Sequence, residues 1–228
     1  MNETTAAVKR EVSGKKVALR VLLYLVVIAV CLITLYPYFA MFCTALKSRA
    51  EIFAVEGTIL PINALWSNFI DIWGRAPMAR YFLNSVLIAG GSTIIAMLCG
   101  IPAAYALARM KFKGQTAFLG VVIVSQMFAP VVLLIGIYKV MLDMSLTDSI
   151  WGLIFINAWN EYTVALCLIS TDVYKPLTVG INIFNGYNMI EWQYLFAASI
   201  FAIIPVVILF MCIEKNLVSG LASGGVKG

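Results

Sequence analysis

Uncharged, mainly apolar stretches alternate with short charged segments along the whole chain. Four continuous stretches cover residues 21–46, 81–108, 114–138 and 192–213. Each is longer than the roughly 20 residues that an α-helix needs to cross the hydrocarbon core of a bilayer. A fifth stretch, residues 149–171, is long enough to cross but carries Glu161 near its middle. The pattern therefore predicts an all-α integral membrane protein, a polytopic helical bundle.

The composition agrees with this pattern and removes several classes of enzyme. Of the 228 residues, 62% are hydrophobic and only 12% are charged, about half the charge of a typical soluble domain. The chain has no histidine, which excludes Ser-His-Asp and Cys-His catalysis and any imidazole-based zinc site. Its five cysteines contain no C-x-x-C pair, and the Gly-rich C-terminal end has no P-loop Lys-Ser pair. We therefore expect no enzyme activity, no metal and no cofactor.

Basic residues mark two segments as cytoplasmic. Five of them precede the first apolar stretch, and three more lie within residues 109–113. Under the positive-inside rule, we expect residues 1–20 to form a cytoplasmic N-terminal segment, residues 21–213 the transmembrane domain, and residues 47–80 an external loop within it. The first stretch is too long for the apolar part of a signal peptide, so we expect it to remain as an anchor. Because the positive charges lie at helix ends, the net charge of +5 does not indicate nucleic-acid binding.

Residues 149–171 leave the topology open. If they cross the membrane, Lys175 is cytoplasmic and the tail, residues 214–228, is external. If they enter and return on the same side, Lys175 is external and the tail is cytoplasmic. Counting basic residues on each side does not decide between these alternatives.

Each long stretch except the fifth contains one proline. These are Pro37, Pro102, Pro130 and Pro205. Because proline removes a backbone hydrogen bond, we expect bent helices, as in a protein that opens and closes a pathway. The alternative is that proline is simply commoner in membrane helices than in soluble ones.

The second stretch also has a face of small residues at a spacing of four. Its members are Ser92, Ala96, Gly100, Ala104 and Ala108. Small residues let two membrane helices approach closely, so we interpret this face as a helix-packing surface. A pore-lining surface is the alternative.

Asn160, Glu161 and Tyr162 form the one polar group well inside an apolar stretch. A carboxylate at this depth is costly unless it faces a bundle interior or a watery cavity. We therefore take these residues as a candidate translocation-pathway or buried polar site. A structural hydrogen bond to another helix is the alternative.

Motifs spread along the chain resemble the permease subunit of binding-protein-dependent carbohydrate ABC importers, the maltose-type branch. The second stretch carries Asn84-Ser85 and then Ala103-Ala104-Tyr105-Ala106, Arg109, Phe112 and Gly114. Later segments carry Gln126-Met127-Phe128 with Pro130, then Trp159-Asn160-Glu161, Leu177-Thr178-Val179-Gly180 and Val218-Ser219-Gly220-Leu221. Each motif is weak alone, but they follow the family order over nearly the whole chain.

The resemblance implies a multi-pass protein of the bacterial cell (inner) membrane that forms part of a sugar translocation pathway. It implies as partners a second permease subunit, separate ATP-binding subunits, an extracytoplasmic sugar-binding protein and the lipid bilayer, but no nucleic acid. The N-terminus would be cytoplasmic. A stand-alone channel or intramembrane enzyme would need more polar spans than this sequence has.

One departure from the family concerns its cytoplasmic coupling loop, marked by Glu-Ala-Ala. None of the seven glutamates here is followed by alanine. The family pattern also has a long stretch between the counterparts of Gly152-Leu153-Ile154 and Ala158-Trp159-Asn160-Glu161 that this chain lacks. The resemblance then implies four or five spans instead of six. Since both flanking pieces resemble outer halves of helices, it favours re-entry of residues 149–171.

The missing loop leaves few cytoplasmic residues to contact an ATPase. The candidates are Arg109, Lys111, Lys113, Gly224, Gly225 and Lys227. The alternative function is a permease-like remnant or accessory membrane protein that assembles with partners but does not couple to ATP hydrolysis.

Overall fold

The computed structural model describes residues 14–55, 57–110, 112–127, 130–156, 162–186 and 189–224. Within these ranges the regular structure is helical, apart from a single bridge between Asn185 and Ile190. The prediction of an all-α polytopic membrane protein is confirmed.

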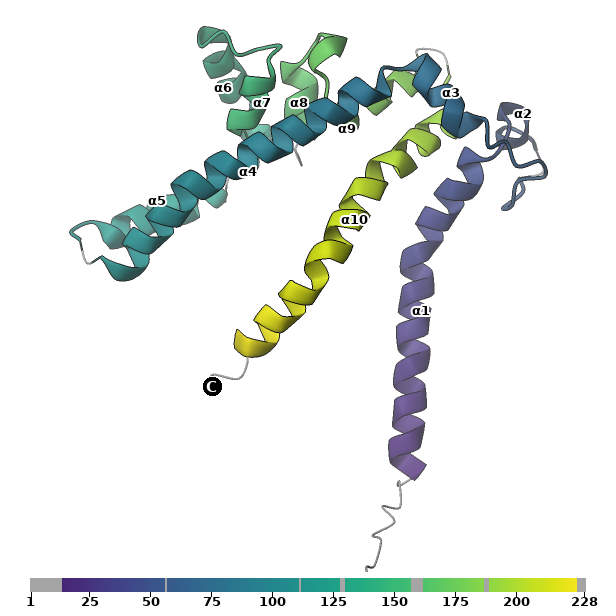
Figure 1. The fold of residues 1–228 in the computed structure, drawn as a ribbon, viewed down its shortest axis with the longest axis horizontal. Helices are drawn as coiled ribbons and strands as arrows, with labels where there is room; N and C mark the ends of the chain where they lie inside the picture. The colour runs from purple at the N-terminus through teal and green to yellow at the C-terminus, as the bar shows by residue number, and fades with distance from the viewer. Residues whose placement is uncertain are drawn as a thin grey trace, which may run out of the picture.

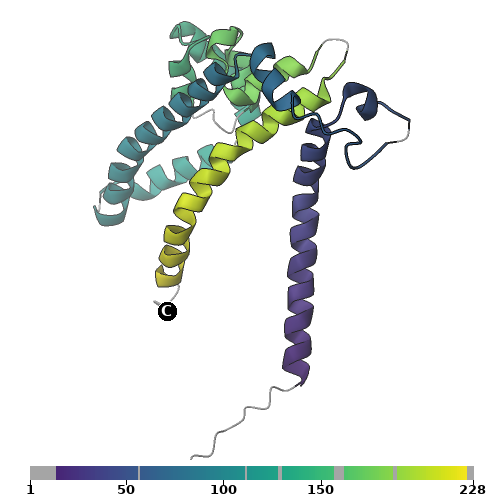
Figure 2. The same cartoon turned by 45° about the vertical axis from the view of Figure 1, so that its right-hand side comes forward.

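Three long helices form the frame of the molecule. They are α1 (Gly14–Ala45), α4 (Met78–Arg109) and α10 (Trp192–Gly224). Each contains a segment long and apolar enough to cross a membrane. The end of α1 and the beginnings of α4 and α10 lie at one end of the molecule, and the helices diverge from there (Figure 1). The view in Figure 2 shows the same divergence, with α1 apart from the other two over most of its length.

The apolar stretch 114–138 is divided between two helices. α5 (Gln115–Gln126) turns back from α4 after Gly114, whose φ of +97° lies in the left-handed region that glycine adopts without strain. α6 (Pro130–Asp143) begins with Pro130. Proline is favoured in the first turn of a helix, where its missing N–H would have no partner, and disfavoured further in. Pro37, Pro102 and Pro205, from the other three apolar stretches, lie inside continuous helices.

Residues 149–171 form a hairpin of two short helices, α7 (Ile150–Ile156) and α8 (Tyr162–Leu168). Its two ends meet, because the backbone N–H of Asp148 donates to the Leu168 carbonyl at 3.0 Å. α7 packs on α4 and α8 on α6. The chain then passes through η1 (Asp172–Tyr174), α9 (Leu177–Gly180) and η2 (Ile181–Phe184) to α10. Two further short helices, α2 (Arg49–Ile52) and α3 (Asn68–Arg75), lie between α1 and α4.

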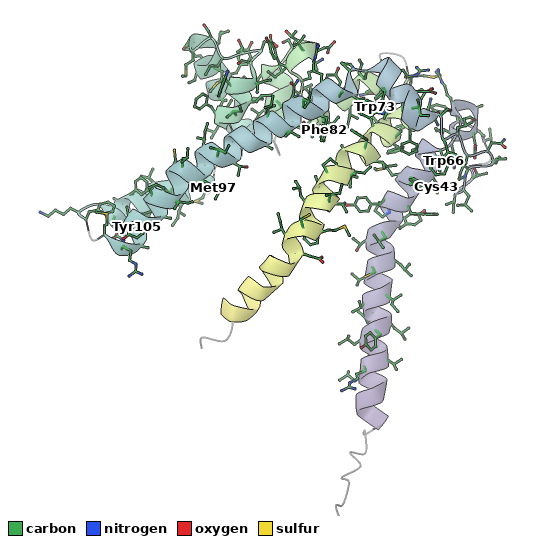
Figure 3. The ribbon with its side chains drawn as sticks, in the orientation of Figure 1. Cys43, Trp66, Trp73, Phe82, Met97 and Tyr105 are labelled. Atoms are coloured by element: carbon green, nitrogen blue, oxygen red, sulfur yellow. The ribbon has the colours of Figure 1, made fainter. Side chains whose placement is uncertain are left out.

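The buried side chains form two clusters, of which the first lies where the long helices meet. The first joins the end of α1, α3 and the beginnings of α4 and α10, around Ile72, Tyr81 and Ala197. The second holds the α7–α8 hairpin against α4 and α6, around Ile88, Leu153 and Val164. Buried residues of α4 end at Ser92, and the far half of the helix is exposed, including Met97 and Tyr105 in Figure 3. One chain therefore packs at one end only, and its remaining helix surface is left for lipid or other subunits.

Candidate functional site

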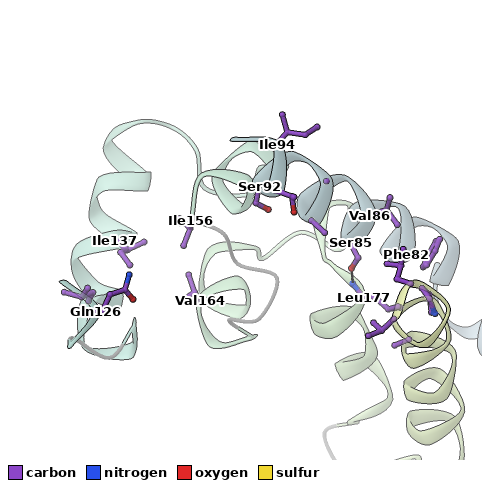
Figure 4. A pocket seen from close by; sticks show the side chains of 18 of the residues that line it. Phe82, Ser85, Val86, Ser92, Ile94, Gln126, Ile137, Ile156, Val164 and Leu177 are labelled. Atoms are coloured by element: carbon purple, nitrogen blue, oxygen red, sulfur yellow. Dashed lines mark hydrogen bonds between the residues drawn. The ribbon is translucent and has the colours of Figure 1, made fainter. Parts of the chain in front are cut away.

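A cavity of about 1130 Å³ lies between α4, α5 and α6, the hairpin and α10. Figure 4 shows Ile156 and Val164, near the tip of the hairpin, and Ser92 and Val86 on α4 at its walls. α10 contributes Ala202, Pro205, Val206 and Leu209. The cavity is thus bounded by α7 and α8 of the hairpin and by the long helices α4 and α10.

The lining is neutral and mostly apolar. Ser92 donates its hydroxyl proton to the Ile88 carbonyl, and Ser125 donates to the Val122 carbonyl at 2.7 Å. Such hydroxyls are partly satisfied by their own helix. Gln126 adds an amide from the end of α5. Among the described lining residues none carries a charge, and the described chain has no cluster of three metal-ligating side chains. The described lining therefore offers hydroxyl and amide groups on a mostly apolar surface.

Asn84 and Ser85 attach the chain that follows the hairpin to α4. The Asn84 side-chain amide donates to the carbonyls of Val173, at 2.9 Å, and Lys175, at 3.0 Å. The Ser85 hydroxyl accepts from the backbone N–H of Leu177 at 2.8 Å. Both side chains are buried. The sequence marked this pair as a motif, but its role in fixing a segment about 90 residues away becomes visible only in the fold.

The predicted polar site is only partly described. Asn160 and Glu161 lie outside the described residues, whereas Tyr162 begins α8. The Tyr162 hydroxyl accepts a hydrogen bond from the Asn182 amide. Tyr162 is not among the residues that line the cavity.

The predicted packing face on α4 is largely uncovered within the single chain. Ser92 is buried at the cavity, while Ala96, Gly100, Ala104 and Ala108 are exposed. A Cβ placed on Gly100 would meet no atom within 4 Å. The face is therefore open to a neighbour from outside the chain.

The candidate ATPase contacts lie at helix ends far from the two buried clusters. Arg109 is the last residue of α4, and Lys113 is exposed in the turn to α5. Gly224 ends α10, whereas Lys111, Gly225 and Lys227 lie outside the described residues. In Figure 1 the α4–α5 turn and the end of α10 both point away from the end that carries α3. Residues from both candidate segments can thus face the same side of a membrane.

Comparison with known proteins shows what the chain is similar to: permease proteins of ABC transporters. No protein-family model matches the chain. It is 26% identical to the inner membrane ABC transporter permease protein YcjP of Escherichia coli (strain K12), over 86% of this chain and 92% of YcjP. It is 23% identical to the melibiose/raffinose/stachyose import permease protein MelC of Bacillus subtilis (strain 168), over 92% of this chain and 98% of MelC.

A solved structure shares the fold. A chain in the crystal structure of a bacterial ABC transporter involved in the import of the acidic polysaccharide alginate matches with a TM-score of 0.73 at 16% sequence identity. The match covers 89% of this chain and 98% of the other. The resemblance to carbohydrate ABC-importer permeases is confirmed.

Both relatives have residues that this chain lacks. The aligned region is 259 positions long for YcjP and 272 for MelC. This chain has 228 residues, of which 86% and 92% are included in the two alignments. Parts of both relatives therefore stand opposite gaps in this chain.

Proposed function

We propose that this chain is the membrane-spanning permease subunit of a carbohydrate ABC importer, driven by separate ATPase subunits. The observation that carries the proposal is the likeness, over most of both chains, to a permease whose name assigns it to melibiose, raffinose and stachyose import. The neutral cavity between α4, the hairpin and α10 is the part of the sugar pathway that this chain contributes. The expected partners are a second permease, ATP-binding subunits and an extracytoplasmic sugar-binding protein.

The proposed topology places both ends of the chain in the cytoplasm of a bacterial cell. The basic residues before α1 and at Arg109–Lys113 favour the cytoplasmic side for the beginning of α1 and for the α4–α5 turn. The contact between Asp148 and Leu168 supports re-entry of the hairpin, which returns the chain to the external side before α10. α10 then crosses inward.

Coupling to the ATPase is where this chain should differ from a full-length relative. ATP-driven closure of an ATPase dimer moves a permease between two states only through a contact that carries free energy. In the resembled family that contact is chiefly the Glu-Ala-Ala loop. Here it is left to the α4–α5 turn and the end of α10. We therefore propose that substrate-stimulated ATP hydrolysis is weak.

The test is reconstitution of the chain in proteoliposomes with a second permease, the ATPase subunits and the sugar-binding protein encoded beside it. We expect the subunits to copurify and to show little sugar-stimulated ATPase activity. A matched variant with a family-type coupling segment inserted after Ile154 should recover both ATPase stimulation and uptake.

Each outcome tests a different part of the proposal: the assignment as a subunit, the transport function or the weak coupling. Failure to copurify with the second permease would overturn the assignment as a subunit. Copurification without uptake, even by the variant with the inserted segment, would support the accessory-protein alternative. Uptake by the unmodified chain at the rate of a full-length relative would contradict the weak-coupling argument and leave the function intact.

A further inference from the structure

The loop that follows α1 is closed on itself. The backbone N–H of Leu65 donates to the Leu46 carbonyl at 2.8 Å, which brings the return of the loop to the end of α1. The buried side-chain amide of Asn68 donates to the carbonyls of Ala45, at 2.8 Å, and Lys47, at 3.1 Å. Residues 47–67 are therefore held as a compact unit at the end of a membrane helix.

Lys47 and Glu51 of this loop both turn toward Thr58, whereas Arg49 and Asn63 are exposed. Lys47 is only 6% exposed, and its ammonium group donates to the Thr58 carbonyl. The Glu51 carboxylate accepts from the Thr58 hydroxyl at 3.0 Å and from the backbone N–H of Ile62 at 2.8 Å. A soluble loop would direct these groups to water, because burying a charge is costly.

The apolar side chains of the same loop are exposed instead. They are Phe53, Val55, Ile59, Leu60, Ile62 and Trp66. Ile62 is 72% exposed and Trp66 61%. Exposed apolar surface that continues over several residues marks a contact with lipid or protein, because water disfavours it. The distribution of polarity in this loop is thus the reverse of that in a water-exposed loop.

We propose that residues 47–67 lie in the boundary between headgroups and acyl chains of the bilayer, with these six side chains in contact with lipid. The patch is continuous with the surface of α1, because Phe42 near the end of that helix meets Trp66 edge to face at 6.0 Å between ring centroids. Figure 3 shows Trp66 beside the end of α1, close to Cys43. Tryptophan is favoured at this depth.

Two further features distinguish shallow insertion from deep insertion and from docking of a polar partner. From residue 52 to residue 70 the sequence contains one charged residue, Glu56, so the loop offers few charges to another protein. Its backbone is irregular outside α2, and irregular backbone is not tolerated in contact with the hydrocarbon core. The boundary between headgroups and acyl chains is compatible with both the low charge and the irregular backbone of the loop.

The experiment measures nitroxide accessibility in the full chain, reconstituted with its partner subunits in vesicles of phosphatidylethanolamine and phosphatidylglycerol. Spin labels are attached to Ile59→Cys and Ile62→Cys in a variant whose five native cysteines are replaced by alanine. Ile28→Cys on α1 gives the reference for lipid and Asp143→Cys at the end of α6 the reference for water. We expect the ratio of oxygen to nickel-chelate accessibility at both loop sites to lie between the two references and well above that of Asp143→Cys.

Two results would overturn the proposal. A ratio equal to that of Asp143→Cys would place the loop in water, and low accessibility to both reagents would mean that a protein partner covers it. The measurement rests on the proposed function for its partner subunits but requires no transport, so a chain that assembles without transporting sugar still gives a result.

A second measurement avoids the cysteine replacements. In the chain with its native cysteines, lipids brominated near the headgroup should quench part of the tryptophan fluorescence. Trp66→Phe should reduce that quenching, while Trp73→Phe, which alters a less exposed ring packed on Phe201 at 4.9 Å, should reduce it less. Quenching unchanged by Trp66→Phe would contradict insertion.

Discussion

The carboxylate of Asp148 accepts a hydrogen bond from the backbone N–H of Ser170, 22 residues further along the chain, at 2.6 Å. A second hydrogen bond comes from the N–H of Thr171 at 2.9 Å. The hydrogen bond from Thr171, together with that from Ser170 and the nearby Lys175 ammonium, lowers the pKa of Asp148 from its usual range. The residue before α7 and the residues after α8 are thus joined by a charge-assisted contact, and the hairpin closes at its base.

Replacing Asp148 should loosen this base. Asp148→Ala removes the acceptor for two N–H groups, and we expect a loss of about 1 kcal/mol, since the site is partly exposed to water. Asp148→Asn keeps a neutral acceptor and should cost less. The thermal midpoint of the purified chain measures both, with Asp143→Ala as the control. Equal midpoints for Asp148→Ala and the control would show that the contact does not hold the hairpin.

The same contact predicts a dependence on pH. Because the pKa of Asp148 is lowered in the folded state, its stabilisation is present above the unfolded value of about 3.9 and is lost as the pH falls through the folded value. Between pH 5 and pH 8, as rough limits of the range where Asp148 stays ionised, the difference between the wild type and Asp148→Asn should be constant. Thermal midpoints below about pH 4 should converge. A difference that instead grows on acidification would assign the effect to another group.

A hairpin that returns predicts the side from which single cysteines react. In a cysteine-free chain in intact cells, Asp143→Cys before the hairpin and Ser170→Cys after it should both react with an impermeant thiol reagent added outside. Lys113→Cys should react only after the membrane is opened. If residues 149–171 cross, Ser170→Cys and Asp143→Cys would react from opposite sides.

The Asn84 amide should be needed as a donor. Asn84→Asp has nearly the same shape but cannot donate to the carbonyls of Val173 and Lys175, and it places a carboxylate against both oxygens. Because these groups are buried, we expect a loss of about 1–3 kcal/mol for Asn84→Asp and for Asn84→Ala. Asn63→Ala, at an exposed asparagine, is the control. Thermal midpoints for Asn84→Ala within error of the control would contradict this role.

The small-residue face of α4 should matter for assembly and not for folding of the single chain. Gly100→Leu introduces a large side chain where the chain itself has no atom within 4 Å, so the thermal midpoint of the isolated chain should be nearly unchanged. The yield of complex with the second permease should fall, because the partner helix is held away. Leu98→Ala, at an exposed leucine on another side of α4, should reduce the yield less. Equal yields for the two variants would show that the face is not a contact surface.

The sequence by itself determined the class of fold and the long helices. α1, α4 and α10 lie over the apolar stretches 21–46, 81–108 and 192–213. This agreement has a local cause: a stretch long enough to cross a bilayer must satisfy its own backbone hydrogen bonds, and in a single segment only a helix does so. The family motifs are equally local, which is why the resemblance could be read from them.

The packing of the two short helices within residues 149–171 is visible only in the tertiary structure. Their hydrophobic length allows either a crossing or a return, because the hydrophobic effect is non-directional and does not specify which path the apolar segment takes. The hairpin depends on contacts between distant segments: Asp148 with Ser170 and Thr171, and Leu153 and Val164 in one buried cluster with Ile88 of α4. No pattern within a single stretch contains those pairings.

Which side chains of the loop after α1 are exposed is likewise visible only in the tertiary structure. From composition, residues 47–80 form an external segment too polar to cross a membrane. The fold directs Lys47 and Glu51 inward to Thr58 and leaves Ile62 and Trp66 outside. Which side chains face outward depends on how the loop closes at Leu46 and Leu65, and that closure is a hydrogen bond between residues that the sequence does not show to be neighbours.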